Sequence, residues 1–159
     1  MDNKFFQIVE LFKIDNLIEA KKLIEEIYMS MTNNPAYCLK MIMKYSGLNK
    51  MDFIDIMEIS ERTYETYLYS SMPSYNKKTL IRLILKLNLP PIISKHLLNI
   101  SGCSLNLGNE NEGWIYFIIE NCWKRSIEEN IKYLNKTHKT PATRLLFFYN
   151  LRNSNLKVY

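Results

Sequence analysis

Glycine, cysteine and histidine are scarce in this 159-residue chain, and each scarcity excludes a class of protein. Only 4 glycines are present, too few for glycine-rich phosphate loops, dinucleotide-binding fingerprints or the turns of an all-β fold. The 3 cysteines, Cys38, Cys103 and Cys122, form no C-x-x-C pair, so we expect reduced thiols in a reducing compartment. The 2 histidines, His96 and His138, are too few and too isolated for a zinc site or a catalytic triad.

Long hydrophobic runs are also missing. No apolar stretch approaches the roughly 18–20 residues that a transmembrane helix needs, and the amino-terminal sequence lacks the basic-then-apolar layout of a secretory signal. The sequence therefore predicts a cytoplasmic protein with no membrane partner. Because no set of acid, base, nucleophile or metal ligand converges, we also predict that the protein is not an enzyme and binds no metal or cofactor.

The chain is basic, with a formal net charge of +5, and its charge is unevenly distributed. Residues 1–33 carry 4 basic and 6 acidic side chains, residues 34–105 carry 9 and 5, and residues 106–159 carry 8 and 5. The positive charge therefore begins where the central segment begins. A basic centre fits nucleic acid, a membrane surface or an acidic protein partner.

Apolar residues recur at spacings of three and four along nearly the whole chain, which is the period of an amphipathic helix. With 47% hydrophobic residues the chain can bury a packed core. The sequence predicts an all-α protein. After two amino-terminal helices within residues 3–31, the second capped by Asp15, helices are expected at 36–45, 50–57, 61–69, 77–87, 92–100, 113–121, 126–135 and 141–149.

These helices are expected to form three parts. Residues 1–33 form an amino-terminal helical hairpin, residues 34–105 a central domain, and residues 106–159 a carboxyl-terminal helical extension. The amino-terminal helices are apolar over more surface than a short pair can bury alone. We therefore predict a homodimer that pairs through the flanking helices.

Residues 50–69 have the layout of a helix-turn-helix, in which two short helices cross steeply at a tight turn. The apolar positions that hold the two helices together are Phe53, Met57, Ile59, Tyr64 and Tyr67. This packing leaves the amino-terminal half of the second helix protruding, where its side chains would reach base edges in a major groove. The side chains displayed there are Ser60, Glu61, Arg62, Glu65 and Thr66.

The pattern resembles the phage-repressor class of helix-turn-helix proteins, the Cro/C1 or Xre type. Segments 47–50, 59–63, 79–83 and 87–90 carry the resemblance, which extends over residues 36–101. It implies a domain of about five short helices that binds double-stranded operator DNA, commonly as a dimer. The function it implies is sequence-specific transcriptional regulation of a bacterial or phage type.

Four cations are candidates for contacts to DNA. Lys50 stands where the resembling family often has a glutamine that contacts a phosphate. Lys77 and Lys78 open a helix, where the dipole disfavours cations, so their placement is compatible with phosphate contacts, although a solvated pair is the expected alternative and slightly preferred. Arg62 would read a base edge or, as the alternative, pair with a glutamate on the helix surface. The glutamates available for such a pair are Glu58 and Glu65.

The sequence departs from the family pattern at several positions. Ile54 replaces the usual small residue of the first helix, and Glu58 replaces the turn glycine. A left-handed glutamate costs about 1 kcal/mol or more, so we expect a wider or differently wound turn. The second helix carries two acidic residues against one arginine, and residues 69–75 replace a loop that usually contains glycine and basic residues. These departures favour an alternative function, a helical protein–protein interaction module that kept the repressor-like fold but lost DNA binding.

Overall fold

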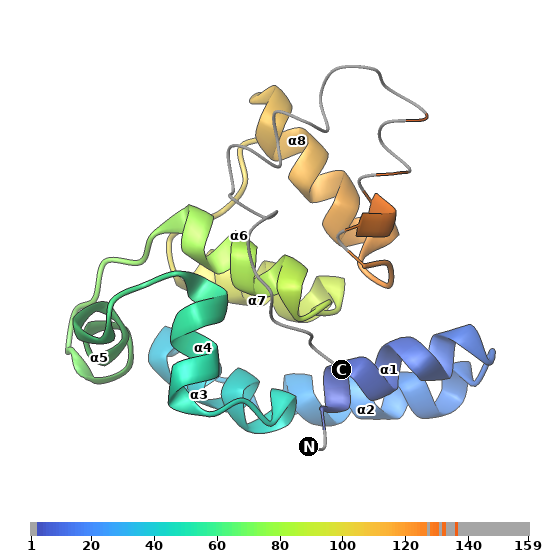
Figure 1. The fold of residues 1–159 in the computed structure, drawn as a ribbon, viewed down its shortest axis with the longest axis horizontal. Helices are drawn as coiled ribbons and strands as arrows, with labels where there is room; N and C mark the ends of the chain where they lie inside the picture. Colours follow the sequence, from blue (N-terminus) through green and yellow to red (C-terminus); the bar gives the residue numbers. More distant parts are fainter. Residues whose placement is uncertain (1–2, 127, 131, 133–135, 137–159) are drawn as a thin grey trace.

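The computed structural model describes residues 3–126, 128–130, 132 and 136. Within this part eight α-helices and one short π-helix follow one another without any strand (Figure 1), so the predicted all-α class is confirmed. In the same part of the chain, no helix is both long and apolar enough to cross a membrane. The helix predicted at 141–149 and much of the one predicted at 126–135 lie outside the described residues.

The two amino-terminal helices, α1 (Lys4–Lys13) and α2 (Leu17–Met29), lie side by side (Figure 1). Asn16, and not Asp15 as predicted, caps α2, because its side chain accepts a hydrogen bond from the Glu19 amide. Asp15 instead takes a left-handed backbone conformation with φ of 58°. Aspartate enters this region more readily than most residues, and the chain reverses there between the two helices.

The central helices begin and end close to their predicted positions. They are α3 (Pro35–Ser46), α4 (Lys50–Met57) and α5 (Glu61–Tyr69). Gly47 ends α3 with φ of 68°, a left-handed conformation in which glycine has no Cβ to clash. Asn49 opens α4 through a reciprocal capping box with the N3 residue. These caps are local hydrogen bonds, which is why the sequence pattern located them.

Four further elements complete the described part: α6 (Lys77–Lys86), α7 (Pro91–Ile100), α8 (Glu110–Phe117) and the π-helix η1 (Ile118–Cys122). The helix predicted at 113–121 therefore begins three residues earlier, and its second half is wound as a π-helix. Asn109 accounts for the earlier start, because its side chain accepts a hydrogen bond from the backbone of α8.

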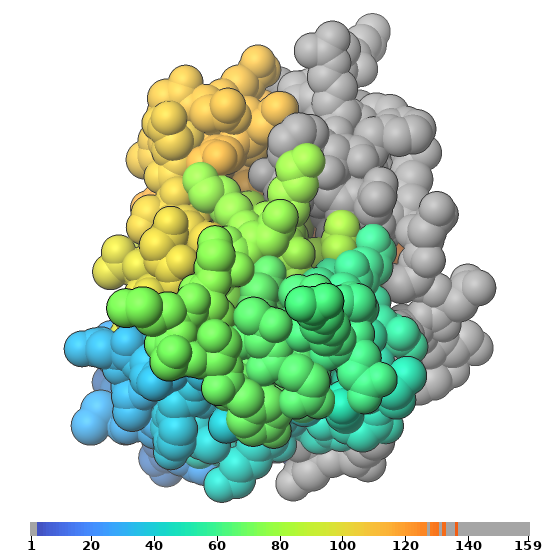
Figure 2. Space-filling view, turned by 90° about the vertical axis from the view of Figure 1, so that its left-hand side faces the viewer, coloured from blue at the N-terminus to red at the C-terminus, as the bar shows by residue number. Residues whose placement is uncertain are grey.

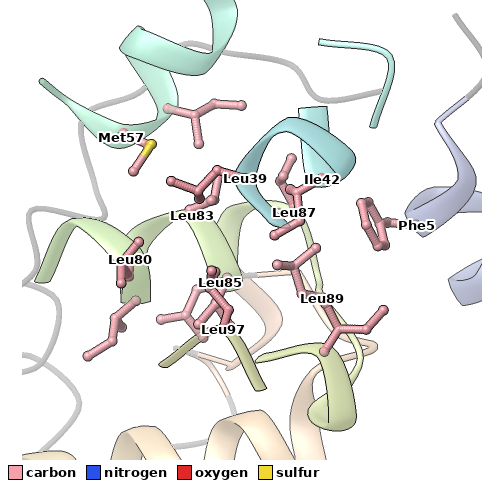
Figure 3. Close-up of a cluster of buried hydrophobic side chains, with 14 of the residues drawn as sticks. Phe5, Leu39, Ile42, Met57, Leu80, Leu83, Leu85, Leu87, Leu89 and Leu97 are labelled. Atoms are coloured by element: carbon pink, nitrogen blue, oxygen red, sulfur yellow. The ribbon is translucent and has the colours of Figure 1, made fainter. Parts of the chain in front are cut away.

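Helix α6 lies at the centre of the molecule, and its residues 79–86 are all buried. Helices α4 and α7 pack against it. A helix apolar around most of its circumference is stable only when it is enclosed in this way. One hydrophobic core includes residues from all three predicted parts, from Phe5 to Trp123. The predicted domain boundaries near residues 33 and 105 stay predictions. Core side chains labelled in Figure 3 include Phe5, Leu39, Ile42, Met57, Leu80, Leu83, Leu85, Leu87, Leu89 and Leu97.

Candidate nucleic-acid interface

The turn between α4 and α5 is tight, and Glu58 itself takes the left-handed conformation, with φ and ψ both 51°. The prediction of a wider or differently wound turn is therefore wrong, because Glu58 takes the left-handed conformation that glycine would take there. The amides of Glu58 and Ile59 donate hydrogen bonds to the carbonyls of Asp55 and Ile54, at 3.2 Å each. This is the usual way in which a left-handed residue satisfies the last carbonyls of a helix. A non-glycine residue in this conformation costs about 1 kcal/mol, so Glu58 needs a stabilising contact.

A buried arginine on α6 holds this turn in place. Arg82 donates from Nη1 to the Met57 carbonyl oxygen at 2.7 Å, and its Nη2 lies 3.3 Å from Oε2 of Glu58. The Arg82 side chain is only 9% exposed, and charged hydrogen bonds of this kind are stronger away from water. The contacts explain why glutamate is tolerated where the family pattern has glycine. Sequence reasoning missed this role, although a cation within an otherwise apolar stretch of helix was a usable signal.

Helix α5 buries one side against the core and exposes the other. Tyr64 and Tyr67 are buried as predicted, and the Tyr64 ring packs edge to face on Phe53 with 6.1 Å between ring centroids. Ser60 caps the helix as predicted, accepting a hydrogen bond from the Thr63 amide at 3.1 Å. Figure 2 shows the face of the molecule on which α5 lies. The five side chains predicted to face the groove are all exposed: Ser60, Glu61, Arg62, Glu65 and Thr66.

Lys50 of α4 binds two carboxylates of α5. Its Nζ lies 2.6 Å from Oε1 of Glu61 and 2.6 Å from Oε1 of Glu65. The hydrogen bond from Lys50 lowers the pKa of Glu61, and the hydrogen bonds to Glu61 and Glu65 raise the pKa of Lys50. Lys50 and Glu61 are therefore charged at neutral pH. The structure thus brings together three residues predicted to contact DNA, Lys50, Glu61 and Glu65. However, the ammonium group of Lys50, which was predicted to bind a phosphate, is already paired with two carboxylates of the same chain.

Arg62 makes neither of the ion pairs that the sequence left open. Glu58 pairs with Arg82 and Glu65 pairs with Lys50, while no ion pair of the Arg62 guanidinium occurs among the described residues. The Arg62 backbone carbonyl accepts a hydrogen bond from the Thr66 hydroxyl at 2.9 Å. This leaves an exposed guanidinium in the first turn of α5.

Lys77 and Lys78 occupy different environments at the start of α6. The Nζ of Lys77 lies 3.0 Å from each carboxylate oxygen of Glu112 on α8. Burial alone would raise the pKa of Glu112, but hydrogen bonds from the Asn106 amide and from Lys77 lower it. Lys77 therefore attaches α8 to α6, whereas Lys78 is exposed. The two neighbouring lysines, for which the sequence predicted the same phosphate contact, therefore differ in their surroundings.

The described residues offer little for chemistry of another kind. Among them, no group of three or more histidine, cysteine, aspartate or glutamate side chains is placed to hold a metal ion. The thiols of Cys38, Cys103 and Cys122 are free and buried, and burial raises the pKa of each, which makes them poor nucleophiles. The absence of enzymatic activity stays a prediction.

Comparison of the chain with protein-family models, with curated proteins and with solved structures finds no match. The resemblance to repressors of the Cro/C1 or Xre type therefore rests on the sequence alone, in segments 47–50, 59–63, 79–83 and 87–90.

Proposed function

We propose that this protein is a DNA-binding transcriptional regulator that places α5 in the major groove of duplex DNA. The observation that carries the proposal is the α4–α5 unit, in which a left-handed turn at Glu58 joins two short helices and one side of the second is exposed. A single helix presented in this way matches the width of the major groove. The buried Arg82 holds the turn, so the angle between the helices is fixed before DNA binds.

The exposed side chains of α5 can read bases by distinct chemistry. The guanidinium of Arg62 can donate two hydrogen bonds to O6 and N7 of guanine, the most common specific contact in major grooves. Carboxylates such as Glu61 and Glu65 accept hydrogen bonds from the N4 amino group of cytosine. The hydroxyls of Ser60 and Thr66 can serve either base or phosphate.

Two lysines are proposed as phosphate contacts. Lys78 is exposed at the start of α6, and Lys50 can turn from the α5 carboxylates to a phosphate. Lys77 was the third candidate, but its bidentate pair with Glu112 makes it a structural residue in this proposal. Phosphate contacts of this kind position the helix in the groove and supply most of the non-specific affinity.

One observation favours the alternative, a protein–protein interaction module. Lys50, Glu61 and Glu65 together carry a net charge of −1 on the exposed side of α5. A negative cluster at this place repels a polyanion and suits a basic protein partner. The two functions are separated by whether the protein binds duplex DNA in a salt-dependent manner.

Binding to duplex DNA should be measured by fluorescence anisotropy over a series of salt concentrations. Lys78→Ala is expected to weaken binding to every sequence and to make the slope of log K against log salt less steep by about one unit. Arg62→Ala should cost about 1–3 kcal/mol on a preferred site selected from a random pool, with non-specific binding nearly unchanged. Lys13→Ala is a matched control, because Lys13 is exposed on α1 and pairs only with Glu10 among the described residues.

The wild-type protein is the first arm of this experiment. If neither it nor a variant with Glu61 and Glu65 changed to glutamine binds a random duplex at low salt, DNA binding is excluded. The interaction module would then be the function to test.

A further inference from the structure

The outward face of α2 carries two strongly exposed hydrophobic side chains. Met29 is 81% exposed and Ile18 is 73% exposed. At 3.6 residues per turn these two residues, together with Lys22 and Glu25, fall within about 60° of one another around the helix axis. They form one stripe, which we call the α2 stripe, on the side away from the core. The buried residues of α2, on the opposite side, are Ala20 and Ile27.

The charged residues beside the α2 stripe are arranged so that two copies of the helix, laid antiparallel, would bring opposite charges together. From the amino-terminal end of α2, the exposed residues on and beside the stripe that enter this argument are Ile18, Lys21, Lys22, Glu25, Glu26 and Met29. A second α2 laid antiparallel on this face, with a twofold axis level with the midpoint between residues 23 and 24, places Ile18 opposite Met29 of the partner subunit. Lys21 and Lys22 then lie opposite the glutamates of the partner subunit. A parallel arrangement would instead oppose lysine to lysine and glutamate to glutamate, which is unfavourable.

These charges are only weakly engaged within one copy of the chain. Lys21 pairs with Glu25 and Lys22 with Glu19, each at 3.4 Å between side chains that are 49–75% exposed. Exposed pairs along one helix contribute a few tenths of a kcal/mol. Exchanging them for pairs across an interface therefore costs little, while Ile18 and Met29 would lose contact with water. The remaining charged residue beside the stripe, Glu26, pairs with Lys4 at 2.7 Å, and its side chain remains half exposed.

We propose that the α2 stripe is a homodimer interface, in which two copies of this chain pair antiparallel about a twofold axis. Such an interface is isologous, because each copy contributes the same patch. The turn between α1 and α2 and the exposed helix α5 lie at opposite ends of the long axis of the molecule (Figure 1), so pairing here leaves α5 uncovered. The inference does not rest on the proposed DNA binding.

Sedimentation equilibrium of the full chain, without DNA and from low to high micromolar concentration, tests the interface. The wild type should show a monomer–dimer equilibrium. Changing Lys21 and Lys22 to glutamate, or Glu25 and Glu26 to lysine, should raise the dimer dissociation constant by about tenfold or more, because like charges then face each other. An equimolar mixture of the two variants should form a heterodimer, since at positions 21, 22, 25 and 26 one chain now carries four glutamates and the other four lysines. The control changes Lys44 and Lys132, both exposed, to glutamate.

Three results would overturn the proposal: a wild type that stays monomeric, a dimer that both charge reversals leave unchanged, or a mixture without heterodimers. If circular dichroism shows that either variant loses helix, the variant that exchanges all four charges decides, because it keeps the complementarity with inverted signs. Its dimerisation supports the interface, and its failure to dimerise refutes it. Because no DNA is present, none of these results bears on the proposed function.

Discussion

Changing Glu61 and Glu65 to glutamine is expected to strengthen binding to non-specific duplex DNA by about tenfold or more at low salt. The change acts in two ways. It removes two negative charges from the exposed side of α5, and it releases the Lys50 ammonium, which both carboxylates hold at 2.6 Å. A freed Lys50 can neutralise one further phosphate, so the slope of log K against log salt should become steeper by about 0.9.

Anisotropy titrations with a random duplex at several salt concentrations measure both effects. A variant with Glu10 and Glu19 changed to glutamine alters the net charge equally, but its substitutions lie on α1 and α2 and should have a much smaller effect. Adding Lys50→Ala to the double glutamine variant should reverse the change in slope. If the affinity and the slope both stay at wild-type values, α5 does not lie against DNA.

Changing Arg82 to alanine is expected to lower the free energy of unfolding by about 2–4 kcal/mol. The substitution removes the donor to the Met57 carbonyl and leaves Glu58 in its left-handed conformation without its ion pair to Arg82. Loss of one partner of a fully buried pair costs about 3–5 kcal/mol. The Glu58 side chain is 33% exposed, so the ionic part of the cost is reduced by solvent screening.

Urea denaturation followed by circular dichroism measures this loss. Arg62→Ala provides the control, because that arginine is exposed and its removal should change stability by no more than about 0.5 kcal/mol. Adding Glu58→Gly to the Arg82→Ala variant should recover about 1 kcal/mol, since glycine adopts the left-handed turn without strain. A loss below about 1 kcal/mol for Arg82→Ala would show that the turn does not depend on this arginine.

The sequence by itself determined the local structure of the central helices α3, α4 and α5. The caps at Asn49 and Ser60 and the left-handed end of α3 at Gly47 involve backbone groups within a few residues of the capping residue, so they can be read from neighbours along the chain. The apolar spacing in α5 likewise predicted which side is buried and which five residues are exposed, because helical periodicity alone decides this.

Only the tertiary structure decided which charged groups meet. Arg82 reaches the turn after α4 from 24 or 25 positions away, Lys50 reaches across to α5, and Lys77 pairs with a glutamate 35 residues later. Glu58 is tolerated in the left-handed turn because a buried guanidinium from another helix stabilises it there. Such contacts depend on where helices cross in space. Helical periodicity assigns a residue to a face of its own helix, but it does not specify which residue of another helix lies opposite.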